Sequence, residues 1–141
     1  MKINLLSFCF LLIANLSAYS QRWAQQGETI TGIEKNDCFG ASVSLSANGN
    51  IMAVGASEYM VTPGKGYVIV YQWNGSGWIQ KGSTINGIEV EDAFGAAVSL
   101  NSTGNILAIG AKEGDTTGYV KVYSWNGSYW IITVKSQTIF L

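Results

Sequence analysis

The sequence predicts an all-β protein built from two similar units. Residues 39–56 and 94–111 are identical at 12 of 18 aligned positions, without a gap. In both stretches apolar side chains alternate with small ones, which is the period of a strand with one buried face. No segment after residue 20 has the period of an amphipathic helix. Together these observations predict a repeated β architecture.

The first 20 residues have the layout of a secretory signal peptide, so they fall outside the predicted fold. A basic start at Lys2 is followed by an apolar run from Leu5 to Ala14, and small residues precede a cleavage point at Gln21. The run is shorter than the ~20 apolar residues that a bilayer-spanning helix needs. We therefore expect a secreted, extracellular or cell-surface protein of a bacterium, with no stable membrane span after cleavage.

The composition excludes several classes of function. The chain contains no histidine, which removes the commonest general base, the usual catalytic triads and most zinc sites. Cys38 is the only cysteine after the signal peptide, so no intrachain disulfide is expected. With a formal net charge of −1 and no basic patch, the chain is not expected to bind nucleic acid.

The first two strands of each unit lie within the repeated stretch. The first strand begins at Phe39, and its alternating apolar residues predict one buried face, while the small residues between them predict a close neighbour. The apolar positions are Phe39, Ala41, Val43 and Leu45, and the small ones are Gly40, Ser42 and Ser44. After a turn at Asn48-Gly49, the second strand at 51–54 is apolar on both faces and should be an interior strand.

The third and fourth strands complete each unit. Gly66–Trp73 predicts the third strand, because two valines face one way and Tyr67, Ile69, Tyr71 and Trp73 face the other. The polar stretch from Trp78 to about Ile85 predicts an outer edge strand. Residues 23–30 match this edge strand closely, so we expect an extra outer strand with no preceding three. The second unit repeats the third strand at 118–125 and begins the edge strand at Trp130.

Four antiparallel strands in a period of about 50 residues describe one blade of a β-propeller. The sequence therefore predicts two blades plus an extra N-terminal strand, an incomplete propeller because closed rings have about four to eight blades. Either the chain is a fragment of a longer propeller protein, or several copies assemble. A β-sandwich of about eight strands is the alternative architecture. The expected parts are the signal peptide (1–20), an outer strand and loop (21–38), blade 1 (39–93) and blade 2 with a diverged C-terminal end (94–141).

Over about residues 23–130 the chain resembles the FG-GAP repeats of integrin α-subunit propellers and of many secreted bacterial proteins. The resemblance is carried by the Phe-Gly pairs at 39–40 and 94–95, by an aspartate two residues before each pair, and by the third strand with its Gly-x-Val-x-Val-Tyr pattern. It implies a propeller-type fold and an extracellular binding or adhesion role.

Many FG-GAP blades carry an Asp-rich calcium loop between the first and second strands. The corresponding loops here, at 46–50 and 101–105, contain no carboxylate. Calcium takes about six to eight oxygen ligands, several of them usually charged. The sequence therefore does not support calcium in these loops, and no cofactor is expected.

The loops that lead into the two units gather acidic residues, and these are the first candidate binding site. The candidates are Glu34 and Asp37 in the first unit and Glu89, Glu91 and Asp92 in the second. One interpretation is an acidic ligand rim, with Asp37 and Asp92 as weak candidates for a cation. The other is that both aspartates hydrogen-bond backbone N–H groups in their own turns.

Aromatic residues on the third and fourth strands are the second candidate. Trp73 and Trp125 hold equivalent positions and have rings that could stack on sugars. Such rings more often fill space between packed sheets.

Three functional hypotheses remain open. The first is a secreted, non-catalytic binding or adhesion module for an extracellular protein or glycan. The second is a carbohydrate-active propeller domain, although paired catalytic carboxylates need two different environments and repeated positions tend to be alike. The third is a truncated remnant without independent function. Exposed Trp and Tyr surfaces also predict self-association.

Overall fold

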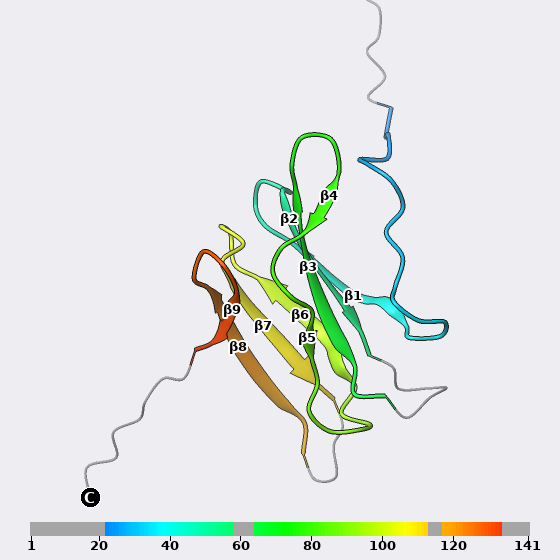
Figure 1. Cartoon of the computed structure of the whole chain (residues 1–141), viewed down its shortest axis with the longest axis vertical. Coiled ribbons are helices and arrows are strands. Elements are labelled where there is room, and N and C mark those ends of the chain that lie inside the picture. The colour runs from blue at the N-terminus through cyan, green and yellow to red at the C-terminus, as the bar shows by residue number, and fades with distance from the viewer. Residues whose placement is uncertain (1–21, 58–63, 113–116, 134–141) are drawn as a thin grey trace, which may run out of the picture.

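The computed structural model describes residues 22–57, 64–112 and 117–133, which form two antiparallel β-sheets (Figure 1). These residues contain no helix, so the prediction of an all-β fold is confirmed. They likewise contain no apolar helix that could span a bilayer. The predicted signal peptide lies outside the described residues.

The first sheet contains five strands. Its order is β1 (Phe39–Leu45), β2 (Ile51–Ala56), β3 (Tyr67–Trp73) and β4 (Trp78–Gln80), and β5 (Ile85–Asn86) pairs with β3 beside β4. Each strand is antiparallel to its neighbour, and the first four follow each other in chain order. The sheet is therefore a simple meander with β1 at one edge.

The second sheet repeats this plan with four strands. Its order is β6 (Phe94–Leu100), β7 (Ile106–Ala111), β8 (Tyr119–Trp125) and β9 (Trp130–Ile132). The pairing register also repeats, since Phe39 lies opposite Ala56 in the first sheet and Phe94 lies opposite Ala111 in the second. The sequence repeat is thus also a structural repeat.

A bulge follows the first residue of both β1 and β6. Gly40 and Gly95 occupy the bulges with φ angles of 92° and 89°. Glycine is favoured there because a side chain disfavours positive φ. The Phe-Gly pair therefore marks the point where each sheet begins.

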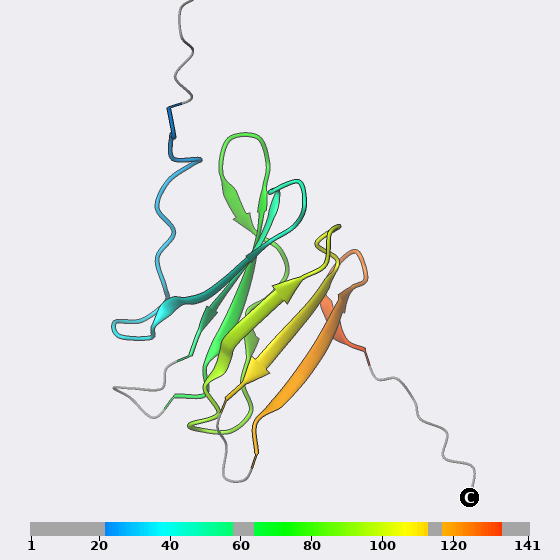
Figure 2. The same cartoon turned by 180° about the vertical axis from the view of Figure 1, so that it is seen from behind.

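The two sheets stack so that β6 lies over β1 and β2 (Figure 2). The Ser42 hydroxyl donates to the Gly95 carbonyl at 2.6 Å, and the Leu100 N–H donates to the Ser44 hydroxyl at 2.9 Å. A Cβ on Gly55 would lie 2.1 Å from the Gly95 carbonyl oxygen, so only glycine permits this approach. The predicted close neighbour beside the small residues of the first strand is confirmed.

The main core lies between the facing sides of the two sheets. The buried residues that form it come from β2, β3, β6, β7 and β8: Ile51, Ala53, Val68, Val70, Phe94, Leu107, Ile109, Ala111 and Tyr123. The aliphatic residues Val98 and Leu100 of β6 pack against this core.

The predicted burial of Val43 and Leu45 is wrong. Both side chains are about half exposed, at 53% and 54%. They project from the side of β1 that faces away from the second sheet, whereas the equivalent Val98 and Leu100 face the first sheet and are partly buried. The same sequence pattern is thus buried only where a second sheet covers it.

The outer strands also differ from the prediction. The expected strand from Trp78 to Ile85 is split into β4 and β5, with Gly82 between them at a φ of 80°. The expected N-terminal strand at 23–30 has no strand geometry. It nevertheless lies against the first sheet, where its Gln26 carbonyl accepts the indole N–H of Trp78 at 3.1 Å.

Candidate functional site

The turn that leads into β1 is organised by Asp37, whose side chain is 6% exposed. Its Oδ2 accepts the backbone N–H of Glu34 at 3.0 Å, and its Oδ1 accepts that of Phe39 at 2.9 Å. The Tyr67 hydroxyl donates to the same carboxylate and accepts the backbone N–H of Ile33 at 3.0 Å. Asp37 therefore ties its own turn to the first residue of β3.

Asp92 organises the equivalent turn before β6 and is 2% exposed. Its Oδ2 accepts the Glu89 N–H at 3.3 Å and the Tyr119 hydroxyl at 2.5 Å. We call residues 33–39 and 88–94 the aspartate turns. The interpretation that these aspartates hydrogen-bond within their own turns agrees with this geometry, and the tyrosine partner was not anticipated.

Hydrogen bonding keeps Asp37 ionised in its buried position. Burial, the largest influence, raises the pKa of this carboxyl, but the bonds from Tyr67, Glu34, Phe39 and Ile33 together lower it below its usual value. On the second sheet, burial and then the bond to Asp92 raise the pKa of the Tyr119 hydroxyl. Asp37 is thus a buried carboxylate and Tyr119 a neutral phenol at neutral pH.

The backbone of the aspartate turns is strained at matching positions. Asn36 and Cys38 have φ angles of 67° and 56°, and Glu91 and Ala93 have 70° and 48°. A left-handed conformation at a residue other than glycine costs on the order of 1–3 kcal/mol and persists only where the surroundings enforce it. The buried aspartates supply that enforcement through their hydrogen bonds.

The tips of the aspartate turns carry exposed residues. Ile33 is 61% exposed and Ile88 is 57% exposed, and each is followed by an exposed glutamate, Glu34 or Glu89. Since each turn precedes the first strand of its sheet, both lie at the end of the molecule away from the β1–β2 and β6–β7 hairpins (Figures 1 and 2). The predicted acidic residues therefore divide into buried aspartates and exposed glutamates.

The described residues contain no group of three or more Asp, Glu, Cys or His side chains that could hold a metal ion. In the β1–β2 loop, the side-chain Oδ1 of Asn48 accepts the Ser46 hydroxyl at 2.8 Å and the Asn50 N–H at 3.0 Å. In the β6–β7 loop, the Asn101 side chain accepts the N–H groups of Asn105 and Ile106 at 2.9 and 3.0 Å. Amide and hydroxyl groups close these loops.

Trp73 and Trp125 each pack against the tryptophan that follows them across a hairpin. The ring centroids of Trp73 and Trp78 are 5.5 Å apart at 61°, and those of Trp125 and Trp130 are 5.4 Å apart at 57°. The Trp130 indole N–H donates to the Lys81 carbonyl at 3.0 Å, as Trp78 does to Gln26. Both indoles therefore hold the outer segment of the preceding unit.

A glycine lies in the cradle formed by each tryptophan pair. A Cβ on Gly27 would lie 2.8 Å from Trp73, and one on Gly82 would lie 2.8 Å from Trp125. The rings proposed for sugar stacking thus contact glycine backbone, and the Lys81 ammonium lies 4.4 Å above the Trp125 ring. The repeated Trp-x-x-x-Gly spacing was the sequence signal for this contact.

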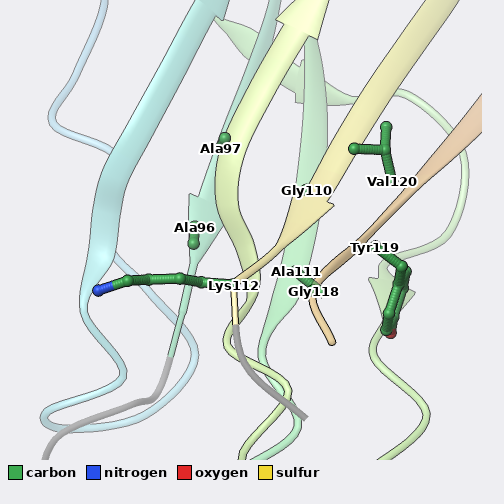
Figure 3. A pocket seen from close by; sticks show the side chains of 8 residues that line it. All are labelled: Ala96, Ala97, Gly110, Ala111, Lys112, Gly118, Tyr119 and Val120. Atoms are coloured by element: carbon green, nitrogen blue, oxygen red, sulfur yellow. The ribbon is translucent and has the colours of Figure 1, made fainter. Parts of the chain in front are cut away.

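A hollow of about 500 Å³ lies on the face of the second sheet that points away from the first sheet (Figure 3). No sequence pattern predicted this hollow. Its lining is mostly small and apolar residues from β6, β7 and β8 and the adjoining loops: Ala96, Ala97, Gly110, Ala111, Lys112, Gly118, Tyr119 and Val120.

No family model matches the sequence, and a search of curated proteins finds no match. The resemblance to FG-GAP repeats therefore rests on the residues quoted above.

Proposed function

We propose that this chain is a secreted, non-catalytic binding or adhesion module that uses the two aspartate turns as its contact surface. The observation that carries the proposal is the repeated geometry of these turns. Each is held by a buried aspartate and presents one exposed isoleucine beside one exposed glutamate, Ile33–Glu34 and Ile88–Glu89. A stiff backbone favours binding because little conformational entropy is lost on contact.

The proposed architecture is propeller-like, of the FG-GAP type. Its support is the way in which the sheets stack. The side of the first sheet that carries Ser42 and Gly55 contacts the side of the second sheet that carries Leu100, while the equivalent of Ser42, Ala97, points away. Unlike faces thus meet, as in successive blades, whereas the two inner faces of a sandwich are alike.

A non-catalytic role is supported by the state of the carboxylates. Asp37 and Asp92 are occupied by backbone and tyrosine donors, in two environments built alike. General acid–base chemistry with two carboxylates requires environments that separate their pKa values. The chain also has no histidine to serve as a base.

The expected partner is an extracellular protein or glycan that offers apolar patches flanked by cationic or hydrogen-bonding groups. Isoleucine supplies apolar area, and the adjacent glutamate supplies a charge that fixes orientation. Nucleic acid does not fit this surface, because a chain with an isoelectric point near 5.3 lacks the required positive charge.

The test is binding of the protein, beginning at Gln21, to panels of extracellular proteins and glycans. We expect that Ile33→Ser combined with Ile88→Ser abolishes the binding found with the unaltered protein. Ile79→Ser is the matched control, because Ile79 is 50% exposed on β4, away from the aspartate turns. Binding that survives the double substitution would contradict the proposed surface, and glycan hydrolysis would favour the carbohydrate-active alternative.

A further inference from the structure

The second sheet has a face that the described residues leave uncovered, which we call the open face. It is made of apolar and small side chains that project away from the first sheet: Ala97, Ile106, Gly110, Val120 and Val122. Val120 is 67% exposed and Ile106 is 45% exposed. Apolar area of this kind commonly marks a contact surface.

The first sheet has the equivalent face, and there it is covered. By the sequence repeat, Val68 corresponds to Val120 and Val70 to Val122. Val68 and Val70 are 0% and 2% exposed, because the second sheet packs over them, whereas Val120 and Val122 are 67% and 37% exposed. One molecule therefore contains both a filled and an unfilled version of the same contact.

The contact on the first sheet indicates which groups fit the hollow of Figure 3 on the second sheet. In the first sheet, the corresponding surface is occupied by the backbone of Phe94 and Gly95. A Cβ on Gly66 would lie 2.2 Å from the Phe94 carbonyl oxygen, and one on Gly55 would lie 2.1 Å from that of Gly95. In the second sheet the residues at the equivalent sequence positions, Gly118 and Gly110, line the hollow, although Gly118 does not share the positive φ of Gly66.

We propose that β1 of a second copy of this chain docks on the open face, with the backbone of its Phe39 and Gly40 in the hollow. Gly40 has the bulge geometry of Gly95, with φ angles of 92° and 89°. A Cβ on Gly40 would meet nothing within 4 Å, so its surroundings are free to receive a partner. The contact within one molecule is thus repeated between molecules.

The side chains on either side of the proposed contact are complementary. Val43 and Leu45 of the arriving β1 are 53% and 54% exposed, and they correspond to Val98 and Leu100, which pack against the core. In the docked arrangement they cover Ile106 and Val120. Burying these four side chains removes apolar area from water on both copies.

The polar contacts are only partly preserved. Ser99 stands where Ser44 does, so its hydroxyl can accept the Leu45 N–H of the second copy as Ser44 accepts that of Leu100. Ala97 replaces Ser42 and cannot repeat the hydrogen bond to the bulge carbonyl. The contact between copies is therefore weaker than the contact between the sheets of one molecule.

The two docking surfaces are different, so association is head-to-tail and yields a closed ring or an open filament. One local rearrangement is required. Residues 23–25 of the arriving copy correspond to β9 of the first copy and would compete with it for the same place. Trp23 is 100% exposed and has no packing to lose when it turns aside.

The test is the mass of the protein in solution, measured by native mass spectrometry and light scattering over a concentration series. We expect reversible oligomers with the unaltered protein and monomers with Gly110→Ala. In a single molecule a Cβ at Gly110 meets only Ala97, at 3.4 Å, but in the complex it would meet the Gly40 carbonyl. Gly77→Ala, at an open position, is the matched control and should associate normally.

A second substitution tests the same contact through a side chain, without changing a glycine. Val120→Glu places a charge on a side chain that is exposed in the monomer and buried in the proposed complex, and it should also give monomers with unchanged thermal unfolding at high dilution. The proposal is overturned if the unaltered protein stays monomeric into the millimolar range, or if oligomers persist in both variants. Because Ile33→Ser with Ile88→Ser leaves the open face intact, it should not affect the mass, which separates this proposal from the proposed function.

Discussion

At the scale of single residues, the buried aspartates carry most of the local order. Asp37 joins three segments: its own turn, the start of β1 and the hydroxyl of Tyr67 on β3. Asp92 joins its own turn to Tyr119 on β8 through the bonds from the Glu89 N–H and the Tyr119 hydroxyl. A carboxylate that accepts several hydrogen bonds while buried is costly to replace, because each donor is then left without a partner away from water.

The lowered pKa of Asp37 makes stability depend on pH in the acid range. Its ionised form is favoured in the folded state, so its contribution is complete above the ordinary aspartate pKa of about 4 and is lost as the pH falls through the lower folded value. Asp37→Asn should lower the free energy of unfolding by about 1–3 kcal/mol at neutral pH, since its amide NH₂ cannot accept the Phe39 N–H. It should also reduce the fall in stability at acid pH, which we call the acid limb. Denaturant unfolding between pH 2 and pH 7 measures both effects.

The control for that series is Glu34→Gln, which changes an exposed carboxylate in the same turn. It should leave both the neutral stability and the acid limb unchanged. If Asp37→Asn kept the full acid limb, the carboxylate–tyrosine pair would not be its source.

At the scale of secondary-structure elements, each outer segment is held by a glycine placed between two tryptophans. Gly82 interrupts the outer strand with a φ of 80° and lies against Trp125 and Trp130. This contact explains why the predicted continuous strand from 78 to 85 is split. It also explains why residues 23–30 adopt the same position without being a strand, since Gly27 fills the cradle of Trp73 and Trp78.

Gly82→Ala tests this arrangement. The substitution strains a positive φ and places a Cβ 2.8 Å from the Trp125 ring, so we expect a loss of about 1–3 kcal/mol and a change in tryptophan fluorescence. Gly77→Ala provides the comparison, because its Cβ would meet nothing within 4 Å. Equal stabilities for the two variants would show that the tryptophan cradle does not hold the outer segment.

At the scale of the whole molecule, two equivalent sheets stack with unlike faces in contact. The period of the sequence predicted four antiparallel strands per unit with the fourth at the outer edge, because alternation and glycine turns are local signals, but in the first sheet that outer strand is split into β4 and β5. It could not predict that Val43 and Leu45 are exposed while Val98 and Leu100 are partly buried, since burial depends on which face has a neighbour. For the candidate site, it found Asp37 and Asp92 but not their tyrosine partners, which lie about 30 residues away in sequence.

The most direct test of the stacking is a comparison of Gly55→Ala with Gly110→Ala, two equivalent positions on the two sheets. A Cβ on Gly55 would lie 2.1 Å from the Gly95 carbonyl oxygen, whereas one on Gly110 would approach nothing closer than 3.4 Å. In dilute protein we predict that Gly55→Ala lowers the free energy of unfolding by about 3 kcal/mol, while Gly110→Ala changes it by less than about 0.5 kcal/mol. Equal losses from the two substitutions would contradict the stacking of unlike faces.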